Sequence, residues 1–147
     1  MATTESPRRH MPGTATDRLN PTCVLSIVDL RDAIVEHHPD STPTASADSL
    51  VWWTPILGPT ATLMAHRFAT LTARGDRVSI TMGDLARTFG LGESNARLRA
   101  VLGRLERFGV ISVSGTQIAV RLWLPPLRPR QIEQLPGYLA DAYQRLH

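Results

Sequence analysis

Apolar residues recur at helical spacing between residues 82 and 109, and this pattern predicts two short helices joined by a turn. In the first helix, Leu85, Ala86 and Phe89 fall at i, i+1 and i+4, so they share one inward face. Gly90 follows at a position where helices often end in a left-handed residue, a conformation that glycine adopts without steric cost. The small side chain of Ala86 also lets a second helix cross closely at the turn.

The second predicted helix begins near Ser94 or Asn95, because either side chain can accept a hydrogen bond from a backbone N–H as an N-cap. Its inward stripe follows an i, i+3, i+4, i+7, i+10 series, made of Leu98, Val101, Leu102, Leu105 and Phe108. Amide and guanidinium side chains occupy the rest of its surface, at Asn95, Arg97, Arg99, Arg104 and Arg107. Such a face is typical of a helix that enters the major groove of DNA, and also of an ordinary amphipathic helix with solvated charges.

A β-hairpin is predicted directly after the second helix. Residues 110–113 alternate apolar and polar side chains, residues 114–117 contain a glycine and form a turn, and residues 118–124 alternate again. Two such runs around a glycine-bearing turn predict two antiparallel strands. A further short strand is predicted at residues 77–81, ahead of the two helices.

The two helices, the hairpin and the connecting motif LERFGVI at residues 105–111 together resemble the winged-helix regulators of the MarR and GntR type. The resemblance covers residues 60–124. It implies a mainly α fold with a small β-hairpin wing (α+β), it implies double-stranded DNA as the partner, and it implies that the strand at 77–81 pairs with the hairpin. One departure is the turn at residues 90–94, which is longer than in the usual bacterial pattern and leaves the start of the recognition helix open.

We call the second helix, at about 94–108, the recognition helix and the hairpin, at about 110–124, the wing, as the resemblance implies. The side chains expected to make base or near-base contacts lie at the amino-terminal end of the recognition helix: Asn95, Arg97 and Arg99. Ser94, at the predicted start of this helix, is also expected to bind DNA. The side chains expected to hold the DNA backbone are Arg87, Arg104 and Arg107. The wing side chains expected to contact phosphate or the minor groove are Thr116, Gln117 and Arg121.

Charge is distributed unevenly along the chain. Residues 1–49 contain four arginines and seven acidic residues, whereas residues 50–147 contain twelve arginines and six acidic residues. A basic domain attracts phosphates and gains affinity by releasing counterions from DNA. None of the basic residues is a lysine, and the planar guanidinium of arginine suits both guanine and phosphate.

Composition divides the chain into five segments. They are a disordered N-terminal tail at 1–21, a short helical or strand segment at 22–38, a linker at 39–49, the winged helix-turn-helix domain at 50–124 and a C-terminal helical extension at 125–147. In the second segment, residues 24–28 fit either a strand or an extra helical turn, before a helix that starts at Asp29. The tail carries a small basic group, Arg8, Arg9 and His10, which either touches DNA or is solvated.

Trp52 and Trp53 adjoin each other at the start of the domain and, with Pro55, predict an extended entry followed by a helix. We expect at least one of these tryptophans to pack in the core, and the alternative is that the pair stacks on a base. In the C-terminal extension, Pro136 interrupts a nearly heptad apolar stripe, so a short turn of helix and then a second helix are predicted. The second helix either packs back on the domain or forms a homodimer.

Several kinds of site are not expected from these residues. A single cysteine, Cys23, excludes an internal disulfide, and neighbouring His37 and His38 point about 100° apart on a helix, so no metal site is expected. No nucleotide-binding or hydrolase motif occurs, so neither a catalytic residue nor a cofactor is expected. Without a long apolar run or a signal-peptide core, we expect a cytoplasmic protein with no membrane span.

Two functions remain open. The first is sequence-specific DNA binding, as in a bacterial transcription regulator, and the second is a winged-helix module that binds another protein through the Trp52-Trp53 entry and the hydrophobic exit. An effector-sensing regulator would need a further domain, for which the chain after the wing is short. The arginines discriminate, because an open arginine face favours DNA and a face neutralised by acids favours a protein partner. The residues concerned are Arg97, Arg99, Arg107 and Arg121, with the acids Glu93 and Glu106.

Overall fold

The computed structural model describes residues 15–19, 22–92 and 95–147. Its strands are β1 (Val24–Leu30), β2 (Thr42–Pro43), β3 (Val78–Thr81), β4 (Ile111–Ser114), β5 (Gln117–Arg121) and β6 (Trp123–Leu124). Its longer helices are α2 (Ala47–Leu57), α3 (Pro59–Thr72), α4 (Met82–Thr88), α5 (Asn95–Arg107) and α7 (Gly137–Leu146). The one-turn helices are η1 (Ala15–Arg18), α1 (Ala33–Glu36) and α6 (Pro129–Ile132). This combination confirms the predicted α+β class.

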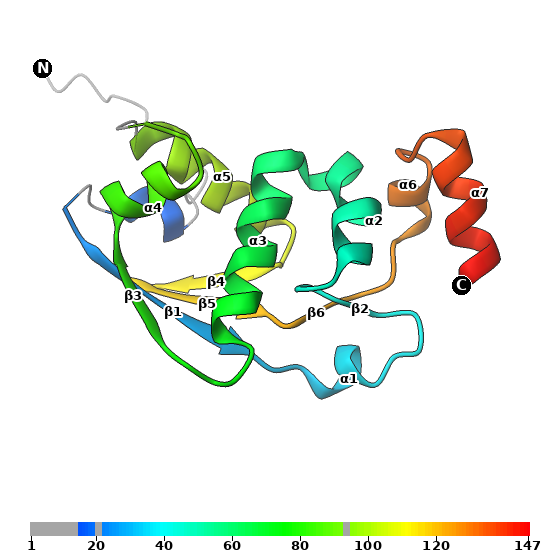
Figure 1. Cartoon of the computed structure of the whole chain (residues 1–147), viewed down its shortest axis with the longest axis horizontal. Coiled ribbons are helices and arrows are strands. Elements are labelled where there is room, and N and C mark those ends of the chain that lie inside the picture. The colour runs from blue at the N-terminus through cyan, green and yellow to red at the C-terminus, as the bar shows by residue number, and fades with distance from the viewer. Residues whose placement is uncertain (1–14, 20–21, 93–94) are drawn as a thin grey trace, which may run out of the picture.

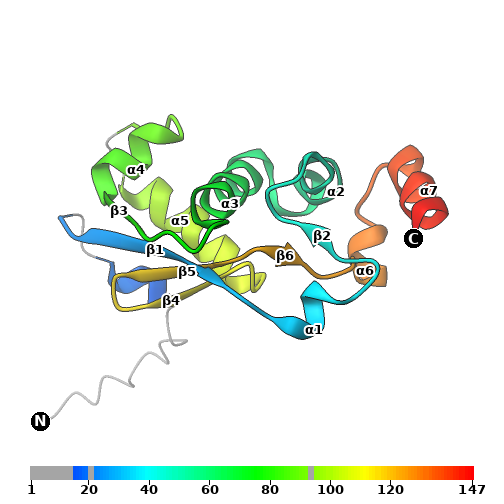
Figure 2. The same ribbon diagram turned by 60° about the horizontal axis from the view of Figure 1, so that its bottom comes forward.

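The described strands form a four-stranded sheet in the order β3-β1-β5-β4 and a small sheet of β2 and β6. Helix α3 lies along one face of the larger sheet, with α2 beside it (Figures 1 and 2). Helices α4 and α5 lie at one end of the molecule, and α6 and α7 lie at the other. The α4–α5 pair is thus separated from the C-terminal helices by the central helices α2 and α3.

Strand β1 lies inside the larger sheet and pairs on both of its edges. It is antiparallel to β3 and parallel to β5, where Ser26 lies opposite Gln117. The expected pairing of β3 with the hairpin is therefore wrong, because β1 lies between them. The run VLSIVDL can occupy this place because it is rich in β-forming residues, and its Leu25 and Ile27 are buried in the core.

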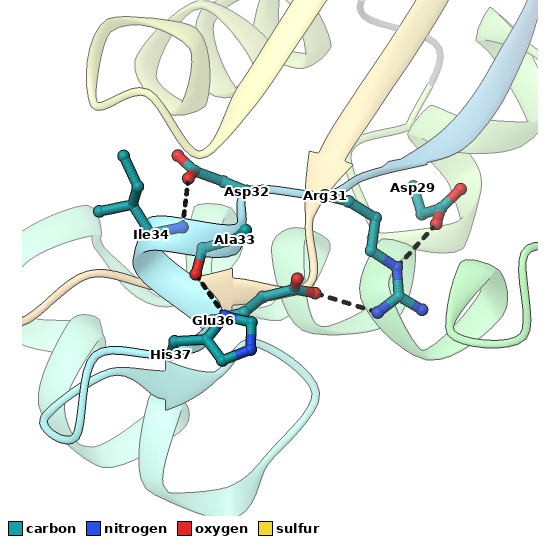
Figure 3. Close-up of polar contacts among 7 residues, drawn as sticks. All are labelled: Asp29, Arg31, Asp32, Ala33, Ile34, Glu36 and His37. Atoms are coloured by element: carbon teal, nitrogen blue, oxygen red, sulfur yellow. Dashed lines mark hydrogen bonds and ion pairs between the residues drawn. The ribbon is translucent and has the colours of Figure 1, made fainter.

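The segment at 22–38 is a strand first and a helix only afterwards. A helix that starts at Asp29 is wrong, because this residue belongs to β1 and α1 begins after Asp32. The Asp32 carboxylate caps α1 by accepting hydrogen bonds from the Ile34 and Val35 N–H groups at 3.1 and 3.4 Å. Figure 3 shows this cap and, beside it, the Arg31 guanidinium between the carboxylates of Asp29 and Glu36.

Two segments that composition predicts to be irregular are partly folded. The tail predicted at 1–21 contains η1, after which Leu19 is only 3% exposed. The linker predicted at 39–49 contains β2 and the start of α2, which the hydroxyl of Ser46 caps by accepting the Ser49 N–H at 3.2 Å. Contacts with distant residues hold both segments, such as the hydrogen bond of 2.6 Å from the Thr44 hydroxyl to the Arg121 carbonyl. Composition does not reveal such contacts. Residues 8–10 lie outside the described residues.

Residues 50–57 belong to helix α2, so the extended entry expected for 50–59 is wrong. A serine cap at its start and a buried side favour the helix, and Pro55 is placed near its end. Trp52 and Trp53 are 6% and 3% exposed, which confirms core packing for both. The ring of Trp52 meets Tyr143 of α7 edge-on, with centroids 5.3 Å apart. Helix α7 therefore packs back on its own chain.

The predicted inward stripe of the second helix is confirmed for its leucines and is wrong for Phe108, which follows the end of α5 and is 39% exposed. Leu98, Leu102 and Leu105 of α5 are fully buried and share one core cluster with Phe68 of α3 and Ile118 of β5. After Pro136, the chain forms α7, as predicted. None of the helices in the described part of the chain has the length and apolar character that a membrane crossing demands.

Candidate nucleic-acid interface

Helices α4 and α5 follow each other in the chain, and hydrogen bonds hold α4 at both of its ends. The hydroxyl of Thr81 caps α4 by accepting the Asp84 N–H at 3.1 Å. Gly90 follows with a φ of +69°, and the Leu91 N–H then donates to the Ala86 carbonyl at 2.9 Å. This pairing satisfies a carbonyl at the end of the helix and directs the chain toward α5.

The recognition helix is α5, and it starts at Asn95 in the structure. Ser94, the other candidate for its start, lies outside the described residues. The leucine stripe buries one side of α5, and the opposite side is exposed. Its exposed residues are Ala96, Arg97, Ala100, Arg104 and Arg107, while Asn95 is half-buried. Arg87 is exposed in the last turn of α4.

Arg99 lies on a different side of α5 from this exposed set. Its Nη1 donates to the Leu19 carbonyl at 3.3 Å, and the guanidinium is partly buried there. The same side of the helix contains Gly103, which is buried, and Glu106. The Glu106 carboxylate accepts hydrogen bonds from the hydroxyl and the N–H of Thr16, at 3.0 and 3.4 Å. Helix η1 therefore covers the side of α5 on which Arg99 was expected to be open.

Arg104 is exposed but is bonded to the backbone of another helix. Its Nε donates to the Leu57 carbonyl at 2.7 Å and its Nη2 donates to the Ile56 carbonyl at 2.8 Å. These carbonyls lie at the C-terminal end of α2, where no backbone N–H of the helix is left to pair with them. The guanidinium of Arg104, from another helix of the same chain, therefore caps this end. The guanidinium also lies 5.4 Å from the ring centroid of Phe108. Arg104 thus joins α5 to α2.

Arg121 is also bonded within the molecule, at the end of β5 remote from the wing turn. Its Nε donates to the Gly109 carbonyl at 2.7 Å, and its Nη1 pairs with the Asp32 carboxylate at 2.9 Å. The hydrogen bond from Arg121 is the main cause that lowers the pKa of Asp32 below its ordinary value. The expected wing contact of Arg121 with DNA has no support in this geometry. The sequence does not predict the pairing of Asp32 with the wing strand, because Asp32 and Arg121 lie 89 positions apart.

The wing turn presents Thr116 and Gln117, which are both exposed. Gly115 precedes them with a φ of +58°, and the Thr116 carbonyl accepts the Ser26 N–H at 2.9 Å. Strand β1 therefore supports the wing at its turn. The turn lies at the same end of the molecule as α4 (Figure 2).

The described ranges contain no cluster of three or more histidine, cysteine or acidic side chains that is arranged to bind a metal ion. The ring Nδ1 of His37 contacts the Ala33 carbonyl at 2.6 Å (Figure 3). Comparison of the chain with protein-family models, curated proteins and solved structures finds no match. The geometry described above is therefore the basis for a functional proposal.

Proposed function

We propose that this chain is a winged helix-turn-helix protein that binds double-stranded DNA through the amino-terminal half of α5. The observation that carries the proposal is the exposed side of α5 at Ala96, Arg97 and Ala100, which follows the capped helix α4 in the chain. Small side chains beside an arginine let a helix approach the floor of a major groove while the guanidinium reaches a base edge.

The proposal divides eight of the ten predicted contact residues into two groups. Of the other two, Ser94 lies outside the described residues and Arg107 is exposed at the far end of α5. Asn95 and Arg97 lie at the end of α5 that would enter the groove. Arg87 is exposed in the last turn of α4, and Thr116 and Gln117 are exposed at the wing turn, which lies at the same end of the molecule as α4 (Figure 2). Asn95 and Arg97 would contact bases, Arg87 would contact phosphates, and the two wing residues would contact the minor groove. The guanidiniums of Arg99, Arg104 and Arg121 hold backbone carbonyls or a carboxylate of distant segments, so we assign these three residues to the fold.

Charge supports the same surface. The segment 50–147, which contains α4, α5 and the wing, has twice as many arginines as acidic residues. Glu106, one of the acids expected to neutralise arginines if the partner is a protein, accepts its hydrogen bonds from Thr16 instead. Such a surface would attract DNA through its phosphates before any base is read.

A specific observation favours the second candidate function, a protein-interaction module. The guanidiniums of Arg99, Arg104 and Arg121, all predicted for DNA, are bonded to other parts of the molecule, which reduces the number of guanidiniums available to phosphates. If duplex DNA does not bind, this function takes the place of the first.

Fluorescence anisotropy of the purified protein tests the proposal, with a duplex of random sequence and a duplex from upstream of its own coding sequence, each at two salt concentrations. We expect tighter binding to the upstream duplex, and we expect this preference to persist at the higher salt. The variant R97A should lose most of the preference, while R145A, which removes an exposed arginine from the distant α7, should keep it. Absence of binding at low salt would overturn the proposal.

A further inference from the structure

Arg107 lies between two hollows at the C-terminal half of α5. The larger, of about 440 Å³, lies between α5 and the α2–α3 junction, with Leu57, Pro59 and Val101 among its walls. The smaller, of about 250 Å³, lies between the end of α5 and the proline-rich exit. It is lined by Phe108, Pro125, Pro126 and Arg128, among others. Arg107 lines both hollows, so they adjoin each other along one groove.

The groove is basic. Arg104 and Arg107 line the larger hollow and Arg107 and Arg128 line the smaller one, and no acidic side chain is among the residues that line either of them. Arg107 and Arg128 have no ion-pair partner among the residues that the structure describes. Two exposed guanidiniums without a counter-charge favour an anion between them, above all a carboxylate or phosphate that accepts hydrogen bonds from both.

The groove also exposes apolar surface between its charges. Phe108 is 39% exposed, and Pro59 and Pro125 are exposed as well. The phosphate backbone of DNA has no apolar groups that would fill these hollows. A peptide, in contrast, can place a carboxylate between two arginines and an apolar side chain in the neighbouring hollow. The positive charge of the groove and the apolar surface beside it therefore favour an acidic peptide over a nucleic acid.

We propose that this groove binds an extended segment of a partner protein in which acidic and apolar side chains alternate. An acidic side chain occupies the smaller hollow, between Arg107 and Arg128, and an apolar side chain occupies the larger hollow, against Leu57, Pro59 and Val101. Arg107 follows Arg97 by ten positions, which is about 15 Å along the helix axis. The smaller hollow is thus well separated from Arg97, whereas the larger hollow includes Ala100, which also belongs to the surface proposed to enter DNA. The binding of a carboxylate between Arg107 and Arg128 does not depend on DNA binding.

The test is the binding of a short fluorescein-labelled peptide in which glutamate alternates with leucine, with the full chain as the receptor. A second peptide carries lysine in place of glutamate. We expect saturable binding of the glutamate peptide and none of the lysine peptide. The variants R107E and R128E should weaken binding roughly tenfold or more each, whereas R145E, which makes the same charge change on α7, should leave it nearly unchanged.

Control measurements separate a specific site from general attraction and from misfolding. The neutral variant R107Q should show an intermediate loss, and circular dichroism should give the same melting temperature for both Arg107 variants as for the unchanged protein. Equal weakening by R145E, or no peptide binding at all, overturns the proposal. Displacement of the peptide by a short DNA duplex, together with an equal loss of duplex affinity in R107E, overturns it too, because the groove then belongs to DNA.

Discussion

Arg121 and Asp32 form an ion pair of 2.9 Å that joins the end of the wing strand β5 to the start of α1. The same guanidinium holds the Gly109 carbonyl, just after the end of α5, at 2.7 Å. One side chain thereby ties together three segments that are far apart in the sequence. Its hydrogen bond to Gly109 connects β5 directly to the residue that leads from α5 into the hairpin.

The lowered pKa of Asp32 predicts a dependence of stability on acid pH. In the folded state the pKa of Asp32 lies below its ordinary value of 3.8. The ion pair therefore stabilises the fold fully when the pH is above 3.8. Its contribution is lost as the pH falls below 3.8 toward the lower pKa of the folded state. The variant D32N keeps an N-cap oxygen but loses the charge, so its unfolding free energy should depend less on pH in this range.

Urea unfolding at a series of pH values between about 7 and 2 measures this difference. D141N, which neutralises an exposed acid on α7, is the control and should follow the unchanged protein. If D32N and the unchanged protein lose stability in parallel below 3.8, then the Asp32–Arg121 pair does not lower this pKa in solution.

Replacement of Arg104 should weaken the fold. R104A removes two hydrogen bonds to the α2 carbonyls and should cost about 1–3 kcal/mol of unfolding free energy. R104K should lose much of the same stability, because an ammonium group cannot reproduce the bidentate geometry of the guanidinium. R107A, one helical turn later at an exposed position, is the matched control and should change the urea midpoint little. A stable R104A would mean that the carbonyls of Ile56 and Leu57 are equally well satisfied by water.

Two glycines in the α4–α5 unit should respond in opposite ways to alanine. Gly90 has a φ of +69°, in the left-handed region, so G90A should destabilise the protein by about 1 kcal/mol through backbone strain alone. Gly83 lies inside α4 without a positive φ, and a Cβ there meets no atom within 4 Å. G83A should therefore stabilise the protein by about 0.5–1 kcal/mol. Thermal unfolding of both variants measures the difference, and the same sign for both would contradict the turn geometry.

The proposed DNA contacts predict different salt responses for two arginines. R87A removes a phosphate contact, so it should weaken binding to all duplexes alike and lower the slope of log K against log salt by about one. R97A removes a base contact and should cost about 1–3 kcal/mol, mainly on the preferred duplex. Anisotropy titrations at several salt concentrations give both quantities. Identical behaviour of the two variants would contradict the different roles proposed for the two residues.

The helices that follow a regular spacing could be predicted from the sequence, and the partners of isolated segments could not. Leu98, Leu102 and Leu105 repeat with the period of the helix, so their burial follows from their order alone. The residues around Ser26 do not predict that it lies opposite Gln117, because a strand with two open edges can pair with any strand of suitable register.

The candidate site shows the same limit. The exposed positions of Arg97 and Arg107 follow from the leucine stripe of α5, which fixes the opposite side of the helix. The bonds of Arg104 do not, because they reach the Ile56 and Leu57 carbonyls, which precede it by more than forty positions. Charge counts treat all arginines as equally available, so they cannot distinguish a guanidinium that meets phosphate from one that meets backbone.

The place of β1 in the sheet also imposes an order on folding during synthesis. Its antiparallel neighbour β3 follows more than forty residues later, and its parallel neighbour β5 follows about ninety residues later. Until β5 has left the ribosome, one edge of the apolar run VLSIVDL has no strand to pair with, and open edges of this kind recruit other chains. The nascent protein is therefore most prone to aggregation in the interval before the wing is synthesised, and completion of the wing ends that interval.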